Sequence, residues 1–192
     1  AMDIEVPLGE ARLVRVDAFA DRLAILRCAE LLGAADRCFR LAVAYMKDRT
    51  QFGQPIGANQ ALKHIAADSY LALENLRVAV EYAAAASDLA ARGGARAAGA
   101  AHAVAVMLAY VPATAREIAE TAIHLHGGIG LTWEYPLNAH MRRIVRLGTA
   151  LGSVSGRRLA LFDHFQREDA ADGAGPAMAG LQQDGVLHDS AL

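Results

Sequence analysis

The segment Ala119–Arg143, AETAIHLHGGIGLTWEYPLNAHMRR, decides how this chain folds. Apolar residues recur at helical spacing up to Leu125 and stop at Gly127-Gly128, which is typical of a helix C-terminus because the reversed backbone there favours positive φ. A new helical pattern begins near Pro136, a residue favoured in the first turn of a helix. The segment predicts two helices joined by a tight turn with bare backbone N–H groups. A dinucleotide-binding fingerprint is not indicated, since that fingerprint requires a preceding strand.

Composition outside this segment favours a helical protein. Of the 192 residues, 54% are hydrophobic but only 6% are aromatic, so alanine and leucine fill the interior, as in closely packed helices. The formal charge of −2 provides no basic field, and we therefore expect no nucleic acid partner. The longest apolar run, residues 103–111, is shorter than the roughly 20 residues that span a bilayer, so no membrane association is predicted.

The two cysteines indicate a reducing compartment. Cys28 and Cys38 fall in one helical pattern, ten residues apart, which corresponds to about 15 Å along a helix. A disulfide needs Cα atoms closer than about 7 Å, so the two cannot pair with each other. A soluble, cytoplasmic protein is predicted.

Hydrophobic periodicity predicts five helices, over about 17–49, 59–92, 95–126, from Pro136 onward, and 154–166. Because the loops between the long helices are short, the predicted fold class is all-α, an antiparallel up-and-down four-helix bundle. The apolar residues at helical spacing in the first helix are Phe19, Leu23, Leu26, Leu32, Ala35, Phe39, Ala42 and Tyr45. Those predicted to face inward in the second are Leu62, Ile65, Ser69, Leu73, Leu76, Val80 and Ala83. Gly33 is predicted to mark a close helix–helix contact, and Pro112 a kink in the third helix.

The ends of the chain differ from this central part. Residues 1–17 alternate loosely like a strand but have no partner strand, so they are predicted to be the remnant of a preceding β-domain and its linker. Residues 18–166 form the predicted helical bundle domain. Residues 167–192 lack periodicity and are rich in Ala, Gly, Asp and Gln, which predicts a disordered tail.

Motifs for metal binding and for nucleophilic catalysis are not found. The seven histidines include no Glu-x-x-His pair; Glu120 and His124 are four residues apart and lack counterparts on other helices, so no metal site is predicted. No Gly-x-Ser-x-Gly elbow is present, and a hydrolase is not indicated.

Two motifs resemble one known family. The run 45–60, YMKDRTQFGQPIGANQ, followed by Lys63 and Asp68, is similar to the acyl-CoA dehydrogenase family, and so is 126–143, HGGIGLTWEYPLNAHMRR. The resemblance covers about Phe19 to Phe165 and corresponds to the C-terminal helical domain of that family. The N-terminal helical domain and the middle β-domain are absent, which would explain the isolated strand-like segment.

The resemblance implies a cofactor and a reaction. Members of the family remove the α-proton of an acyl-CoA with a glutamate while a hydride passes from the β-carbon to FAD, and the FAD lies between subunits. Arg49, Gln51 and Phe52 match positions that reach the FAD diphosphate and adenine of a neighbouring subunit, and Gly127 and Gly128 match glycines that admit the same cofactor. Arginine suits a diphosphate because its planar fork donates two charge-assisted hydrogen bonds. The alternative for Arg49 is a helix-end cation that interacts with the last carbonyls.

Other positions depart from the family pattern. His124 stands where a cofactor-contacting glutamine is usual, and Ser155 stands at a later glutamine position. An ungapped count from Pro136 places the usual catalytic glutamate at Leu151, with Gly152 and Ser153 as its neighbours, and leucine cannot accept a proton. The sequence therefore predicts that the usual base is missing. The resemblance implies that Ser153 and Ser155, like His124, are cofactor-binding positions.

A second location for the base is open. Some family members carry it before an arginine near the start of the first long helix, where this chain has Asp21-Arg22. Asp21 is the alternative base, or else an acid favoured by the dipole at a helix N-terminus. Arg22 could contact substrate or pair with Asp21.

Three functions follow from these features. The first is a subunit, or part of one, of an acyl-CoA dehydrogenase that helps to bind FAD and acts on acyl-CoA. The second is a non-catalytic partner in a homo- or hetero-oligomer, and the third is a helical oligomerisation module without a ligand. The chain alone is not expected to be active.

Overall fold

The structure, a computed structural model, describes residues 16–92 and 97–171. Residues 1–15 of the predicted strand-like remnant and residues 172–192 of the predicted tail lie outside the described residues, whereas Val16 and Asp17, predicted to belong to the remnant, begin the first helix. The elements are α1 (Val16–Asp48), β1 (Thr50–Gln51), β2 (Gln54–Pro55), the 3-10 turn η1 (Ile56–Ala58), α2 (Gln60–Ala91), α3 (Ala97–His126), the 3-10 turn η2 (Gly127–Leu131), α4 (Pro136–Ala150) and α5 (Val154–Ala171).

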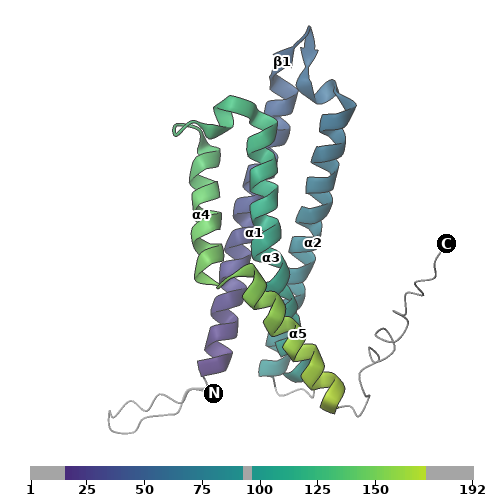
Figure 1. The fold of residues 1–192 in the computed structure, drawn as a ribbon, viewed down its shortest axis with the longest axis vertical. Coiled ribbons are helices and arrows are strands. Elements are labelled where there is room, and N and C mark those ends of the chain that lie inside the picture. The colour runs from purple at the N-terminus through teal and green to yellow at the C-terminus, as the bar shows by residue number, and fades with distance from the viewer. Residues whose placement is uncertain (1–15, 93–96, 172–192) are drawn as a thin grey trace, which may run out of the picture.

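The four long helices α1 to α4 lie side by side along the long axis, each antiparallel to the one before it, and α5 crosses the lower part of the bundle (Figure 1). Helix α3 contacts α1, α2, α4 and α5, so it forms the centre of the packing. The predicted all-α bundle is confirmed. Helix α5 runs to Ala171, beyond residue 166 where the periodicity ends it.

The core follows from the apolar face of each helix. On α2, Ser69, Leu73, Leu76, Val80 and Ala83 are buried, as the spacing predicts. The one hydroxyl in this set is satisfied, since Ser69 Oγ donates to the carbonyl of Ile65 at 3.0 Å. Helix α3 supplies small residues and Met107 to the same core, which lets the helices approach closely.

The predicted close contact at Gly33 of α1 is wrong. The buried stripe of α1 runs through Cys28, Leu31, Ala35, Cys38 and Ala42, whereas Phe19 and Leu26 of the same helical pattern are 65% and 67% exposed. Gly33 is exposed, and a Cβ built on it would meet nothing within 4 Å, so it marks no close contact among the described residues. In both cases, apolar or small residues at helical spacing occur on a face that the bundle does not cover.

Two connections differ from plain loops. The segment after α1 is an antiparallel hairpin in which Thr50 pairs with Pro55 and Gln51 pairs with Gln54. Helix α3 continues through Pro112 as one element, and the Pro112 ring is buried close to Gly148 of α4. The hairpin and the η2 turn lie at the same end of the bundle, where α1 and α3 end (Figure 1).

Candidate functional site

A cleft of about 470 Å³ lies at this end of the bundle. It is formed by the last turn of α1, the hairpin, the start of α2, and the junction of α3 with η2. The residues that line it are Tyr45, Arg49, Gln51, Ile56, Leu62, His124, Leu125, His126, Gly127, Gly128 and Ile129. The fold thus brings together five residues that the sequence predicts for a cofactor site: Arg49, Gln51, His124, Gly127 and Gly128.

The hairpin presents Phe52 at its tip. Phe52 (φ 50°) and Gly53 (φ 82°) both have positive φ, as the two central residues of a type I′ turn do. Glycine adopts this conformation freely, whereas a side chain such as that of Phe52 destabilises it by roughly 1–2 kcal/mol. The Phe52 side chain is also fully exposed, at 101%. Strained residues of this kind cluster at binding sites.

The backbone around Arg49 is held firmly while its side chain is free. The Arg49 amide donates to the Tyr45 carbonyl, and the Ile56 amide donates to the Arg49 carbonyl, both at 2.8 Å. Gly57 sits so close to α1 that a Cβ there would lie 2.9 Å from the Met46 carbonyl oxygen. Within residues 16–92 and 97–171, the Arg49 guanidinium makes no hydrogen bond or ion pair, so its charge is available to an anion in the cleft.

The glycines of η2 have two different roles. Gly127 has a φ of +64°, as predicted for the residue that ends α3. A Cβ on Gly127 or Gly128 would meet nothing within 4 Å, so these two residues expose bare backbone to the cleft. Gly130 is packed instead, because a Cβ there would lie 2.9 Å from the Ile123 carbonyl oxygen.

The side chain of His126 supports the glycine turn through two hydrogen bonds. Its buried ring donates from Nδ1 to the Ala122 carbonyl at 2.7 Å and accepts at Nε2 from the Tyr135 hydroxyl at 3.0 Å. The ring stacks on Tyr45 with centroids 4.6 Å apart. Burial lowers the pKa of His126, so the neutral ring is favoured. Sequence reasoning missed this cluster, although the spacing of four places Arg49, just after α1, one helical turn beyond Tyr45.

Three other predicted residues, Leu151, Ser153 and Ser155, lie at the other end of α4. Leu151 caps that helix, is half-buried, and packs against the core. Ser153 Oγ accepts a hydrogen bond from the Gly156 amide at 3.0 Å, and Ser155 is exposed. Since α4 has 15 residues, about 22 Å of helix separates this junction from the glycine turn. The structure therefore separates these three residues from the cleft.

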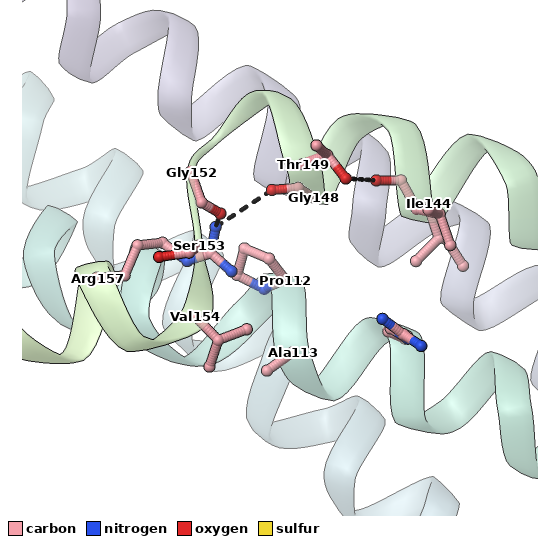
Figure 2. Close-up of a pocket in the computed structure, with 11 residues that line it drawn as sticks. Pro112, Ala113, Ile144, Gly148, Thr149, Gly152, Ser153, Val154 and Arg157 are labelled. Carbon is pink, nitrogen blue, oxygen red and sulfur yellow. Dashed lines mark hydrogen bonds between the residues drawn. The ribbon is translucent and has the colours of Figure 1, made fainter.

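The junction between α4 and α5 borders a second pocket, of about 280 Å³. Figure 2 shows the Arg157 side chain reaching from α5 under the loop, where it donates to the carbonyls of Gly148 (3.2 Å) and Gly152. These are carbonyls that the end of α4 leaves without helical partners. The described polar groups here thus serve mainly to hold the junction together.

Asp21 and Arg22 belong to the second turn of α1. Arg22 is exposed and Asp21 is half-buried, and neither lines either of these two pockets. The structure does not bring them together with the cleft residues.

Comparison with known proteins identifies the family. A profile described as "Acyl-CoA dehydrogenase, C-terminal domain" matches residues 17–155. The chain belongs to this family. It is 40% identical over 124 residues to the acyl-CoA dehydrogenase IpdE2 of Mycolicibacterium smegmatis, which covers 65% of this chain and 36% of that protein. It is also 40% identical over 139 residues to the acyl-CoA dehydrogenase FadE34 of Mycobacterium tuberculosis, a match that covers 72% of this chain and 19% of that protein. The chain thus spans only a minor part of the length of these relatives.

Solved structures resemble the same bundle. A Tcur3481-Tcur3483 steroid ACAD variant superposes with a TM-score of 0.70 at 29% identity, covering 79% of this chain and 40% of that one. The ChsE4-ChsE5 complex from Mycobacterium tuberculosis gives a TM-score of 0.66 at 25% identity, and the match covers 86% of this chain and 42% of that one. The acyl-CoA dehydrogenase C-terminal domain is an all-α bundle, in agreement with the fold described above.

The part of the chain that the structure describes holds neither a candidate metal cluster nor a helix able to span a membrane. No group of three or more His, Cys, Asp and Glu side chains there is placed to hold a metal ion. Among those same residues, no helix combines the length and apolarity that a membrane span requires.

Proposed function

We propose that this chain is the C-terminal part of an acyl-CoA dehydrogenase-like flavoprotein and that its cleft holds the diphosphate and adenine end of an FAD shared with a neighbouring subunit. The observation that carries the proposal is the convergence of Arg49, Gln51 and the Gly127-Gly128 turn on one cleft, from segments far apart in the sequence. This is the set of groups that the family resemblance assigns to FAD.

The chemistry of the cleft fits that cofactor. The unpaired Arg49 guanidinium can form a bidentate contact with a phosphate. The bare backbone at Gly127 and Gly128 leaves room that a side chain would otherwise fill. The exposed Phe52 ring offers a flat apolar face for the adenine. His124, at the usual glutamine position, would contact the same end of the cofactor.

When bound, FAD would supply a hydride acceptor for α,β-dehydrogenation of an acyl-CoA. The α-proton would have to be removed by a protein base, and Leu151 has no group that can accept it. The Ser153 hydroxyl beside it accepts a hydrogen bond from the start of α5. The Ser155 side chain is exposed. We therefore propose that this chain lacks the usual catalytic glutamate, with Asp21 as the alternative base and Arg22 as a substrate contact.

A non-catalytic role in a mixed assembly is the second candidate. It is favoured by Leu151, by His124 in place of glutamine, and by the half-buried apolar surroundings of the α4–α5 junction. One structural neighbour is the ChsE4-ChsE5 complex from Mycobacterium tuberculosis. In this role the chain would hold cofactor for an active partner in a soluble, cytoplasmic assembly of lipid metabolism.

The test is flavin retention by the assembly that this chain forms with its partner subunit. Arg49→Ala should weaken FAD binding by about 10- to 150-fold, the loss of one charge-assisted contact worth roughly 1.5–3 kcal/mol, without changing the melting temperature of the flavin-free assembly. The matched control is Arg40→Ala, which removes an exposed arginine of α1 that pairs with Asp36. Equal flavin content in both variants would refute the assignment of the cleft.

Turnover separates the two candidates. An assembly that retains flavin and reduces a dye acceptor with acyl-CoA has a base somewhere, and Asp21→Asn tests whether this chain supplies it. If Asp21→Asn leaves turnover unchanged, the partner subunit supplies the base and this chain is the non-catalytic member.

A further inference from the structure

A groove of about 280 Å³ lies between α2 and α3, which run side by side (Figure 1), farther from the hairpin than the cleft is. On each helix the lining residues stand at positions i, i+3, i+4 and i+7, which is the spacing of one helix face. The groove, here called the α2–α3 groove, is thus formed by two facing helix surfaces. Its lining residues are Ile65, Asp68, Ser69 and Ala72 of α2 and Thr114, Glu117, Ile118 and Thr121 of α3.

The buried part of the α2–α3 groove carries hydroxyl groups. Ser69 and Thr114 are only 8% and 7% exposed. Ser69 Oγ donates its proton to the Ile65 carbonyl at 3.0 Å, and its lone pairs can still accept. Within residues 16–92 and 97–171, the Thr114 hydroxyl has no hydrogen-bond partner. A buried hydroxyl without a partner is unfavourable, so Thr114 marks a place for a polar group that the described chain does not supply.

The exposed part of the groove carries two carboxylates. Asp68 of α2 and Glu117 of α3 are both exposed, and each lines the groove. Neither makes an ion pair or a hydrogen bond to any residue that the structure describes, whereas Glu120, three residues after Glu117, is paired with Arg116 at 2.7 Å. None of the described lining residues is Lys, Arg or His. Two unpaired negative charges that face one groove favour a positive charge between them.

The size and the walls of the groove favour an organic cation over a metal ion. A Ca²⁺ ion needs about six to eight oxygen ligands at roughly 2.3–2.6 Å, whereas this groove is wide and has the apolar side chains of Ile65, Ala72 and Ile118 in its walls. A quaternary ammonium group is recognised by aromatic rings, and the described lining includes none. A primary ammonium group donates three hydrogen bonds, which suits carboxylate and hydroxyl acceptors.

We propose that the α2–α3 groove binds a small alkylamine, with its ammonium group held by Asp68, Glu117 and Thr114 and its alkyl chain packed on Ile65 and Ile118. The carboxylates select a cation, and the hydroxyl selects an N–H donor over a methylated ammonium group. This inference goes beyond the proposed flavin function, because it uses none of the residues of the cleft. Its test requires neither flavin nor a partner subunit.

The test is a titration of the full chain with n-pentylamine, followed by NMR of the isoleucine methyl groups. Ile65 and Ile118 report on the groove, and Ile144, which does not line it, is the internal reference. Two compounds are matched controls: 1-pentanol has the same alkyl chain without a charge, and pentyltrimethylammonium has the charge without an N–H donor. An N-acetyl-lysine amide presents the same ammonium group as part of a protein side chain.

We expect saturable shifts at Ile65 and Ile118 but not at Ile144, and binding of pentylamine at least about threefold tighter than that of either control compound. Glu117→Gln should weaken binding by at least about threefold, because it removes one exposed charge. Thr114→Val, which keeps the shape of the side chain, should weaken it by about two- to tenfold. Glu81→Gln removes an exposed carboxylate of α2 outside the groove and should leave binding unchanged.

Four results would overturn the proposal. The first is the absence of saturable shifts at Ile65 and Ile118, and the second is equal binding of pentylamine and 1-pentanol. The third is the same affinity in Glu117→Gln as in Glu81→Gln, a comparison that stands even if Thr114→Val does not fold. The fourth is binding of the lysine amide at least about tenfold tighter than that of pentylamine, which would assign the groove to a protein side chain. Unchanged flavin content in the Arg49 test would leave this outcome unaffected.

Discussion

The Nε2 atom of His126 lies 3.0 Å from the Tyr135 hydroxyl, and this contact joins the last residue of α3 to the residue just before α4. The other ring nitrogen is held by the Ala122 carbonyl at 2.7 Å. Both contacts are satisfied by a neutral imidazole whose Nδ1 carries the proton. The turn Gly127–Leu131, which forms one wall of the cleft, is thus closed by a buried side chain that can be charged only at a cost in stability.

This geometry predicts a pH dependence of stability. Burial lowers the pKa of His126 in the folded chain below the ordinary value of 6.5, so the unfolded chain binds a proton that the folded chain does not. The free energy of unfolding should therefore be constant with respect to this group above pH 6.5 and fall as the pH drops below it. Urea unfolding between pH 5 and 8 measures the effect.

The control for this prediction compares the same substitution at two histidines, the buried His126 and the exposed His64. His126→Phe should flatten the acid side of the profile and also lower stability by about 1–3 kcal/mol, because the Tyr135 hydroxyl loses its acceptor. The same change at the exposed His64 should leave the acid side unchanged. A profile that is equally steep in His126→Phe and in the wild type would contradict the prediction.

The two glycines that flank Ile129 should respond differently to alanine. Gly128 is not at positive φ and has open space around it, so Gly128→Ala should change the free energy of unfolding by less than about 0.5 kcal/mol. Gly130→Ala should destabilise the chain by about 1–3 kcal/mol, because the methyl group would meet the Ile123 carbonyl and His126 Cβ, each at 2.9 Å. Chemical denaturation of the two variants measures both changes.

Gly128→Ala also distinguishes an effect on flavin binding from an effect on folding. In the complete assembly, Gly128→Ala should reduce flavin retention although the fold is intact, because its methyl group occupies the cleft. A Gly128→Ala assembly with full flavin content would argue that the cofactor does not approach this turn.

The sequence predicts which residues are buried where one face of a helix meets the core, and predicts the exposed faces and the connections less well. Periodicity predicts the buried face of α2 through Leu73, Leu76 and Val80 because the 3.6-residue repeat translates directly into position. Phe19 and Leu26 share the helical spacing of the core residues but are exposed, since apolarity alone does not show which face of a helix the bundle covers. The hairpin was not predicted because Phe52-Gly53 lacks the Asn-Gly or Asp-Gly pair that signals a type I′ turn.

The candidate site was predictable in part. The two motifs gave Arg49, Gln51 and the Gly127-Gly128 turn, and the structure places these in one cleft. His126 could not be assigned from the sequence, since its role depends on Tyr45 and Tyr135, which are brought to it only by the packing of α1 and α4 against α3. Motif residues mark the place of a site, whereas the residues that support it depend on tertiary contacts.

Both cysteines should be unreactive in the folded chain. Cys28 and Cys38 are fully buried, and burial raises the pKa of each thiol to about 12, with the charge of Arg157 opposing this slightly at Cys28. The thiolate is the reactive form, so modification requires opening of the bundle. We expect the rate with a thiol reagent to be on the order of 100-fold lower in buffer than in denaturant. Equal rates in the two conditions would show that the α1 stripe is not packed as described.

In the assembled protein, Leu151 stands at the position that the family resemblance assigns to the catalytic glutamate. A glutamate at this position would restore the carboxylate whose general-base action is worth roughly 10²–10⁴-fold in rate. Leu151, however, is half-buried against the core, and its amide is fixed by the carbonyls of Leu147 and Gly148, both at 3.2 Å. A carboxylate there would have to leave this apolar contact, and the hydroxyl of Ser153 beside it already serves the start of α5.

We therefore expect Leu151→Glu to recover little activity in a dye-reduction assay with acyl-CoA, well below the 10²-fold lower limit of general-base catalysis. Leu151→Gln is the matched control, since glutamine has nearly the same size and polarity as glutamate but no basic carboxylate. If Leu151→Glu exceeds Leu151→Gln by 10²-fold or more, the position faces a substrate that is correctly placed for proton removal, and only the base has been lost. If instead Asp21→Asn abolishes turnover in the unmodified assembly, the base lies on α1 and the chain is itself catalytic.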